Sequence, residues 1–147
     1  MFFAVAFWGL ICISACSDAQ TKHKAKVSAK PKTATGVAAS LAGGKKVYMQ
    51  YCLPCHQADG AGVQRMNPPL IKTDYVLGDK KRLINIVLKG FNEDVEINGQ
   101  YYSNTMPAHD FLKDNEIANV LTYVRNNFGN KATAIKTAEV TKLRAVK

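Results

Sequence analysis

The stretch YCLPCHQADG contains three residues that can carry chemistry together: Cys52, Cys55 and His56. Their order, C-x-x-C-H, is the spacing at which haem is attached covalently. One helical turn separates the two thiols, so both lie on one face of a helix, and each can add to one haem vinyl group. His56 then lies below the porphyrin centre, where a neutral imidazole nitrogen can bind iron. The motif therefore predicts covalent haem c with His56 as an iron ligand.

Other uses of two neighbouring cysteines fit the sequence less well. A structural disulfide does not need the histidine. A redox-active dithiol belongs between a strand and a helix, whereas the residues before Cys52 have the pattern of an amphipathic helix. A zinc site needs a second ligand pair, and the sequence has no H-x-x-x-H. Because C-x-x-C-H occurs once, we expect one haem and exclude a two-haem peroxidase.

The first fifteen residues, MFFAVAFWGLICISA, contain no charged residue and are shorter than the about 20 residues of a membrane-spanning helix. An apolar run that ends in small residues predicts a secretory signal at residues 1–15. The sequence I-S-A-C, which ends at Cys16, resembles the lipobox of bacterial lipoproteins, and this resemblance implies cleavage before Cys16 and its acylation. Because Lys22 is the first basic residue, an ordinary cleaved signal or a short uncleaved anchor is the alternative.

The four cysteines are all accounted for by these assignments. Cys12 leaves with the signal, Cys16 carries lipid, and Cys52 and Cys55 hold haem. We therefore expect no disulfide.

The net charge of +9 is concentrated at the two ends of the chain. Residues 17–40 hold five Lys and one Asp, and residues 131–147 hold five basic residues and one Glu. Residues 41–130 hold ten basic and nine acidic residues, so this region is nearly neutral, which argues against a nucleic-acid groove. The basic ends are either solvated tails or segments that lie near anionic lipid or an acidic partner.

Composition divides the mature chain into three parts. Residues 16–40 begin at the lipidated cysteine, are rich in Lys and Ala and contain no aromatic residue, which predicts a flexible linker. Residues 41–130 carry the periodic apolar pattern of a folded domain. Residues 131–147 form a basic C-terminal extension, in which Thr137 caps a possible short helix.

Local signals predict the elements of the domain. Gly43 and Gly44 open a helix that runs into the haem motif. A second helix is capped by Asp79 and ends at Gly90. Residues 95–102 form a hairpin around Asn-Gly. The last helix has Lys113 where a capping Ser or Asp is usual, and we expect Asp114 to help.

In combination, the motifs resemble a class I cytochrome c, and more narrowly the small bacterial domains that read GxxxY, CxxCH, PPL, NGQxY, MP and EIAxVLTYVRNxxGN in that order. The resemblance covers residues 41–130. It implies an all-α fold with three main helices around the haem and a small β-hairpin before a methionine-ligand loop. It also implies haem attachment outside the cytoplasmic membrane, which agrees with the predicted export signal.

Further residue roles follow from the resemblance. Gly44 and Tyr48 are expected to meet the last helix around Leu121 and Tyr123. Either Pro68 or Pro69 is expected to offer its carbonyl to His56. The residues expected to pack on the haem are Pro69, Leu70 and Tyr102.

The second iron ligand is predicted to be Met106. Met49 shares a helix with the cysteines, and Met66 lies only ten residues after His56, on the same side of the haem. Met106 lies fifty residues after His56, which is enough chain to return on the opposite face, and it falls at the Met-Pro of the family. The rival ligand is His109.

A His/Met pair fills both axial positions and leaves no site for a small-molecule substrate. We therefore predict an electron-transfer protein rather than an enzyme: a membrane-tethered monohaem cytochrome of the bacterial envelope, facing the periplasm. Its expected partners are an oxidase, a reductase or a dehydrogenase. We expect no nucleic-acid partner. The alternatives are a haem-based sensor or gas-binding protein, and the electron-inlet subunit of a larger oxidoreductase.

Overall fold

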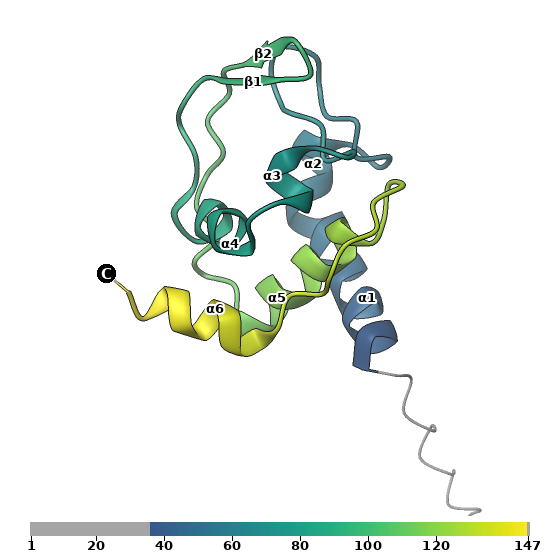
Figure 1. Ribbon diagram of the computed structural model, residues 1–147, viewed down its shortest axis with the longest axis vertical. Coiled ribbons are helices and arrows are strands. Elements are labelled where there is room, and N and C mark those ends of the chain that lie inside the picture. Colours follow the sequence, from purple (N-terminus) through teal and green to yellow (C-terminus); the bar gives the residue numbers. More distant parts are fainter. Residues whose placement is uncertain (1–35, 147) are drawn as a thin grey trace, which may run out of the picture. The chain divides into compact units, whose positions relative to one another are not determined.

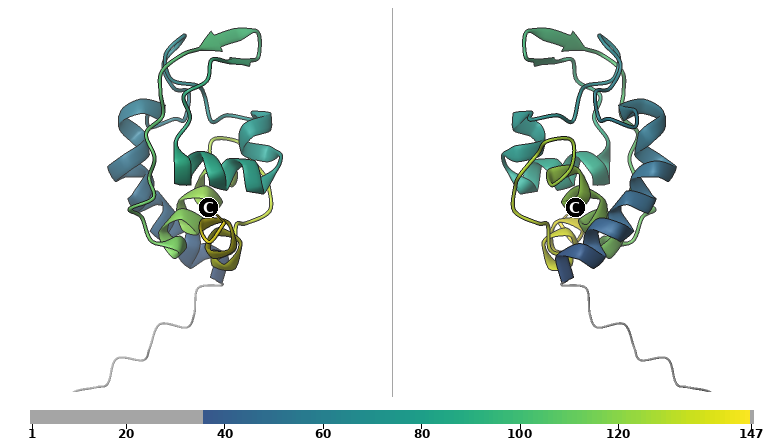
Figure 2. Two further views of the ribbon diagram at one scale, coloured as in Figure 1. Left: turned by 90° about the vertical axis from the view of Figure 1, so that its left-hand side faces the viewer. Right: turned by 90° about the vertical axis from the view of Figure 1, so that its right-hand side faces the viewer.

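A computed structural model describes residues 36–146, in which helices dominate (Figures 1 and 2). The predicted signal, Cys16 and the linker up to residue 35 lie outside the described residues. Within the described part, the helices accompany one two-stranded antiparallel sheet, which confirms the predicted all-α fold with a small hairpin. The elements are α1 (Gly36–Val47), η1 (Tyr48–Cys52), α2 (Leu53–His56), α3 (Asp74–Leu77), α4 (Lys80–Lys89), β1 (Val95–Ile97), β2 (Gln100–Tyr102), α5 (Asp114–Arg125) and α6 (Thr137–Arg144).

The first helical segment runs without a break through α1, η1 and α2 and delivers the haem motif at its end. α1 begins seven residues before Gly43, so Gly43 and Gly44 do not open it, and residues 36–40 belong to a helix rather than to the predicted linker. The alanines in this stretch are strong helix formers, which explains the earlier start. η1 is π-helical, a distortion that is frequent next to functional sites.

α4 and the hairpin follow their local signals. The Asp79 carboxylate accepts a hydrogen bond from the Lys81 amide at 2.8 Å, and α4 ends at Gly90, whose φ is 77°. β1 and β2 pair with Ile97 opposite Gln100, so the Asn-Gly turn lies where the sequence predicts it.

α5 begins at Asp114, but the predicted cap is wrong. The backbone N–H of Lys113 donates to the Glu116 carboxylate at 2.9 Å, so the glutamate of the first turn closes the helix start. The Asp114 carboxylate instead accepts a hydrogen bond from Arg144 of α6 at 2.6 Å.

α6 forms in the region predicted to be a possible short helix, and its cap also differs from the prediction. The Lys136 N–H donates to the Glu139 carboxylate at 2.7 Å, and Thr137 is the first helical residue rather than the cap. In both α5 and α6, therefore, a glutamate in the first turn replaces the missing side-chain cap.

The C-terminal segment is part of the folded domain and not a solvated tail. Ile135 is 5% exposed and Val140 is fully buried. The Ile135 N–H donates to the Thr122 hydroxyl at 3.0 Å, and the Lys80 ammonium donates to the Ala134 carbonyl at 2.7 Å. The folded region therefore extends well past residue 130.

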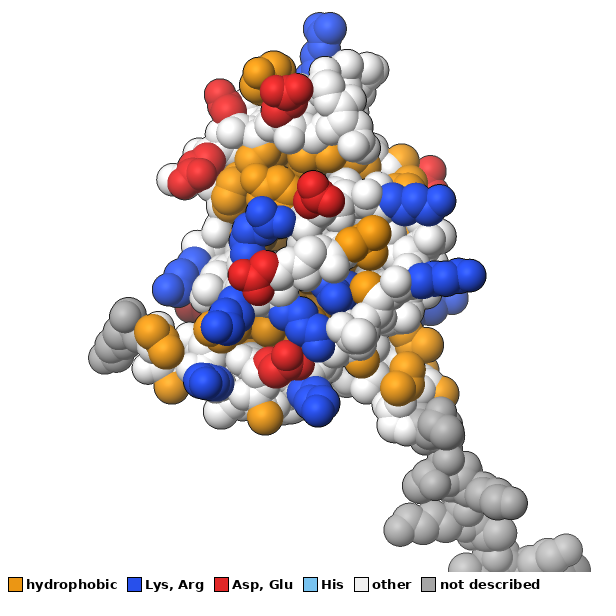
Figure 3. All heavy atoms as spheres, in the orientation of Figure 1, with side chains coloured by type: hydrophobic (Ala, Val, Ile, Leu, Met, Phe, Trp, Pro, Cys, Tyr) orange, Lys and Arg blue, Asp and Glu red, His pale blue; other side chains and the backbone are white. Residues whose placement is uncertain are grey.

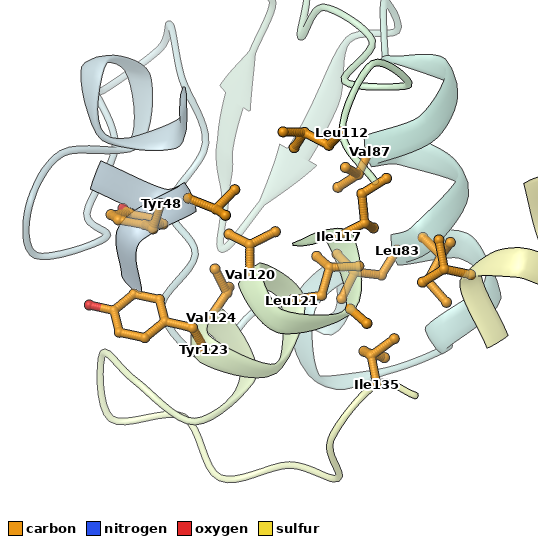
Figure 4. Packing of buried hydrophobic residues seen from close by; sticks show 14 of the residues in the cluster. Tyr48, Leu83, Val87, Leu112, Ile117, Val120, Leu121, Tyr123, Val124 and Ile135 are labelled. Carbon is orange, nitrogen blue, oxygen red and sulfur yellow. The ribbon is translucent and has the colours of Figure 1, made fainter. Parts of the chain in front are cut away.

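α1 and α5 cross where a side chain is missing. A Cβ at Gly44 would lie 2.7 Å from that of Tyr123, so the two backbones can approach only at a glycine. The Tyr48 ring lies 5.5 Å from the Tyr123 ring, as expected (Figure 4). Asn119 and Tyr123 are the residues of α5 nearest to Gly44, and Leu121 lines a cavity described below.

Charge is unevenly distributed over the face shown in Figure 3. Lysine and arginine side chains gather over the region of α4 and α6, and acidic side chains are more frequent toward the hairpin. Between residues 36 and 146, no helix combines the length and apolar character needed to cross a membrane.

Candidate haem site

The haem motif lies at the C-terminal end of the first helical segment. Cys52 ends η1, and Cys55 and His56 lie in α2, so one helical turn separates the two free thiols as predicted. Burial, and secondarily Cys55, raises the pKa of Cys52 to about 11. The Tyr48 hydroxyl donates to the Gln57 carbonyl at 2.6 Å and so fastens the residue that follows His56.

The His56 imidazole is buried and oriented. Its Nδ1 lies 3.0 Å from the Pro68 carbonyl oxygen, which can only accept, so Nδ1 carries the proton and Nε2 presents its lone pair. Burial lowers the pKa of His56 despite this hydrogen bond, which favours the neutral ring. A neutral imidazole with one nitrogen held by a carbonyl is prepared to bind metal. Of the two prolines expected here, Pro68 is the acceptor.

The loop after His56 is fixed to α5 by one buried side chain, Asn130, which is 3% exposed. Its amide nitrogen donates to the Leu70 carbonyl at 2.9 Å and to the Val124 carbonyl at 2.8 Å. Its amide oxygen accepts from the Lys72 N–H at 2.8 Å. The sequence analysis did not select Asn130, although the family pattern ends at this residue.

The loop that carries Met106 is paired with the end of α4. Met106 and Phe91 exchange two backbone hydrogen bonds, of 2.7 and 2.9 Å. Gly90 permits this pairing, because its φ is positive and a Cβ there would lie 2.7 Å from the Met106 carbonyl oxygen. The Asn104 N–H donates to the Met66 carbonyl at 3.2 Å, so the loop is also tied to the segment after His56.

One largely apolar cavity is lined by all four predicted haem-binding residues, Cys52, Cys55, His56 and Met106. It extends between α4 and α5, and Figure 4 labels several of the side chains that line it. The residues fit a haem: the cavity combines two thiols one turn apart, a neutral buried imidazole, a thioether and a hydrophobic lining. Apolar residues of this lining include Leu70, Leu83, Val87, Phe91, Leu112, Val120, Leu121 and Val124.

Not all of the residues predicted to pack on the haem line the cavity. Pro69 and Leu70 line the cavity, whereas Tyr102 is buried but is not part of the lining. The residue of the hairpin that does line it is Ile97, on the strand that pairs with β2. The hairpin therefore contributes a different side chain from the one predicted.

Two of the rival iron ligands, Met49 and Met66, are less well placed than Met106. Met49 and Met66 are about half exposed, at 52% and 49%, and neither lines the cavity. His109 also lines the cavity, with its Nδ1 2.9 Å from the Pro107 carbonyl oxygen and its ring against Phe111, so it stays the rival ligand.

A family model described as Cytochrome c matches residues 41–128, more than half of the 147-residue chain. The chain is 36% identical over 121 residues to a cytochrome c-552 of Thermus thermophilus, covering 76% of this chain and 81% of that protein.

Two further relatives are subunits of dehydrogenases. The chain is 36% identical over 114 residues to the cytochrome c subunit of an alcohol dehydrogenase (quinone) from Gluconacetobacter polyoxogenes, covering 76% of this chain and 24% of that subunit. It is 34% identical over 99 residues to a gluconate 2-dehydrogenase cytochrome c subunit from Pantoea cypripedii, covering 65% of this chain and 22% of that subunit. The chain thus corresponds to less than a quarter of either subunit.

Proposed function

Because the chain belongs to the cytochrome c family, whose members transfer electrons through haem, we propose that it carries single electrons through one haem c held by Cys52 and Cys55 and ligated by His56 and Met106. One observation carries this proposal: the two thiols, the imidazole and the thioether all line a single apolar cavity. The bound haem supplies a one-electron couple. Ligation by both residues would leave the iron no position for a substrate, which is the property of a carrier rather than of an enzyme.

The residues of the chain set the properties of that couple. The Pro68 carbonyl holds the proton of His56 on Nδ1. This keeps the Nε2 lone pair available and makes it a stronger electron donor to iron. The thioether of Met106 is a soft ligand that favours the reduced state relative to a second imidazole. The apolar walls exclude water, which also favours the less charged, reduced state.

Spectra and mass of the purified full-length protein test this proposal. We expect one haem per chain that remains attached after acid denaturation, a far-red sulfur-to-iron absorption band in the oxidised form, and no carbon monoxide binding in the reduced form. Haem that extracts into acid-acetone would contradict thioether attachment. Rapid carbon monoxide binding with no far-red band would instead favour the gas-binding alternative.

The proposal includes a lipid anchor at Cys16, supported by the lipobox-like I-S-A-C that ends there. Acyl chains on one cysteine would hold the domain at the bacterial membrane, because two or more chains give stable attachment. Cys16→Ser is expected to release haem-loaded protein into the periplasmic fraction or to block processing. A processed Cys16→Ser protein that still sediments with membranes at high salt would contradict the anchor.

A dehydrogenase is the partner that the comparisons favour among the predicted oxidases, reductases and dehydrogenases. The observation is the similarity to cytochrome c subunits of an alcohol dehydrogenase (quinone) and a gluconate 2-dehydrogenase. A stable subunit role would appear as co-purification with a larger protein from mild detergent. A freely exchanging carrier would elute alone and still be reduced by membranes that are supplied with the dehydrogenase substrate.

A further inference from the structure

The far end of the segment between Met106 and α5 is held by Arg144 of α6, besides the hydrogen bond from the Lys113 N–H to Glu116. The guanidinium donates from Nη1 to the Asp110 carbonyl and from Nη2 to the Leu112 carbonyl, both at 2.7 Å. Its Nε donates to the Asp114 carboxylate at 2.6 Å. The planar donors of arginine thus bind three acceptors spread over five consecutive residues of the chain.

The near end of the same segment is held by α4. Met106 is paired with Phe91 through two backbone hydrogen bonds, and the His109 N–H donates to the Val87 carbonyl at 2.8 Å. Between these ends, Leu112 is 5% exposed and lines the same cavity as Met106. The seven residues 107–113 therefore form a strap over the cavity, with α4 at one end and Arg144 at the other.

α6 is itself firmly attached, so Arg144 projects from a fixed support. Val140 is fully buried, and the Thr141 hydroxyl donates to the other oxygen of the Asp114 carboxylate at 2.5 Å. On the α4 side, Lys80 lies 3.5 Å from the Glu139 carboxylate. The helix thus connects α4, the start of α5 and the strap.

We propose that Arg144 is a positioning residue for the distal iron ligand: by holding the strap closed, it keeps Met106 on the iron. This role rests on the proposed ligation by Met106. A strap released at its far end can move away from the cavity while α4 and α5 stay packed, and the distal position then opens more often. Loss of even one charge-assisted hydrogen bond shifts such an equilibrium by on the order of tenfold.

The experiment compares Arg144→Ala with Lys142→Ala in the haem-loaded protein. Lys142 is exposed on the same helix, so its replacement removes the same charge while the strap contacts remain. The readouts are the rate of carbon monoxide binding to the reduced form, the pH at which the far-red band disappears, and the free energy of unfolding. Arg144→Lys, which keeps the charge but lacks the planar donors, is the conservative variant. Met106→Ala shows the signal of a fully open distal position.

We expect Arg144→Ala to bind carbon monoxide on the order of tenfold faster than the parent protein and to lose the far-red band at lower pH. Arg144→Lys should be intermediate, and Lys142→Ala should match the parent. An Arg144→Ala protein that is less stable but unchanged in band and carbon monoxide binding would overturn the proposal. If Arg144→Ala yields no haem protein, Arg144→Lys decides by the same two readouts. If Met106→Ala keeps the band, the ligand assignment itself is wrong, and the role of Arg144 falls with it.

Discussion

At the scale of single residues, the orientation of His56 depends on a backbone atom that lies twelve positions away. The C-x-x-C-H spacing predicts that the two cysteines and the histidine lie together, because they fall within about one helical turn. It cannot tell which proline carbonyl faces the ring, because that depends on how the loop folds back. The Pro68 carbonyl accepts the hydrogen bond from Nδ1–H, and both prolines line the cavity.

Asn130 is the residue-scale connection that sequence reasoning missed, and its loss should be costly. Asn130→Ala would leave the Leu70 carbonyl, the Val124 carbonyl and the Lys72 N–H without their partner. Because the first two groups are held by a side chain that is almost fully buried, we expect the free energy of unfolding to fall by about 2 kcal/mol.

Denaturant unfolding of the oxidised protein measures this effect. The matched control is Asn115→Ala at an exposed position of α5, which should change stability by no more than about 0.5 kcal/mol. Equal stabilities of the two variants would show that Asn130 does not hold the loop.

At the scale of elements, local signals succeed where start and stop residues act on their own helix. α4 and the hairpin form where Asp79, Gly90 and the Asn-Gly pair place them. The caps of α5 and α6 were not predicted, because Glu116 and Glu139 turn back to close these helices without a capping residue of the usual type. The role of Asp114 could not be predicted, because its partners come from a helix later in the chain.

The crossing of α1 and α5 gives a sharp comparison between two neighbouring glycines. In Gly44→Ala the new Cβ would meet the backbone of Asn119 and the Cβ of Tyr123, neither of which can move easily. In Gly43→Ala it would meet only the flexible amide end of the Asn119 side chain, at 3.0 Å.

We expect Gly44→Ala to lower the free energy of unfolding by about 1–3 kcal/mol. Gly43→Ala should leave it unchanged or raise it by up to about 1 kcal/mol, because alanine favours the helix. Thermal and denaturant unfolding of both variants provide the measurement. A similar loss in both would mean that the two helices do not approach most closely at Gly44.

The contact between α5 and α6 should be sensitive to acid. Hydrogen bonds from Thr141 and then from Arg144 lower the pKa of Asp114 in the folded protein. A lowered pKa means that the carboxylate stabilises the fold above its unfolded pKa, and that this contribution disappears as the pH falls below about 4. The melting temperature of Asp114→Asn should therefore fall less between pH 7 and pH 3 than that of the parent protein.

A charge-matched control for this acid dependence is Glu93→Gln, which removes one exposed carboxylate near the hairpin. Its melting temperature should fall between pH 7 and pH 3 as steeply as that of the parent protein. A parent-like slope in Asp114→Asn would show that this carboxylate does not couple α6 to α5.

At the scale of the whole molecule, the cavity between α4 and α5 explains why so much of the fold follows from one motif. Apolar side chains from both helices, such as Leu83 and Leu121, face this cavity, so a haem held there would complete the core. The resemblance to cytochromes c implied this architecture, and the family match confirms it. The buried C-terminal segment was not predicted, because only two of its side chains, Ile135 and Val140, are deeply buried and a pair carries no clear period.

The proposed ligation by Met106 connects it, through the iron, to His56, which lies fifty residues earlier in the chain. Its loop is held by Phe91 and Gly90, so replacing the side chain with alanine should leave the backbone in place. The haem should also stay bound, since Cys52 and Cys55 are untouched.

The decisive measurement is therefore the spectrum and carbon monoxide reactivity of Met106→Ala beside the parent protein. We predict that the variant keeps its haem, loses the far-red band, has a lower reduction potential, and binds carbon monoxide in the reduced state where the parent does not. A Met106→Ala protein that retains the band and still excludes carbon monoxide would contradict ligation by Met106.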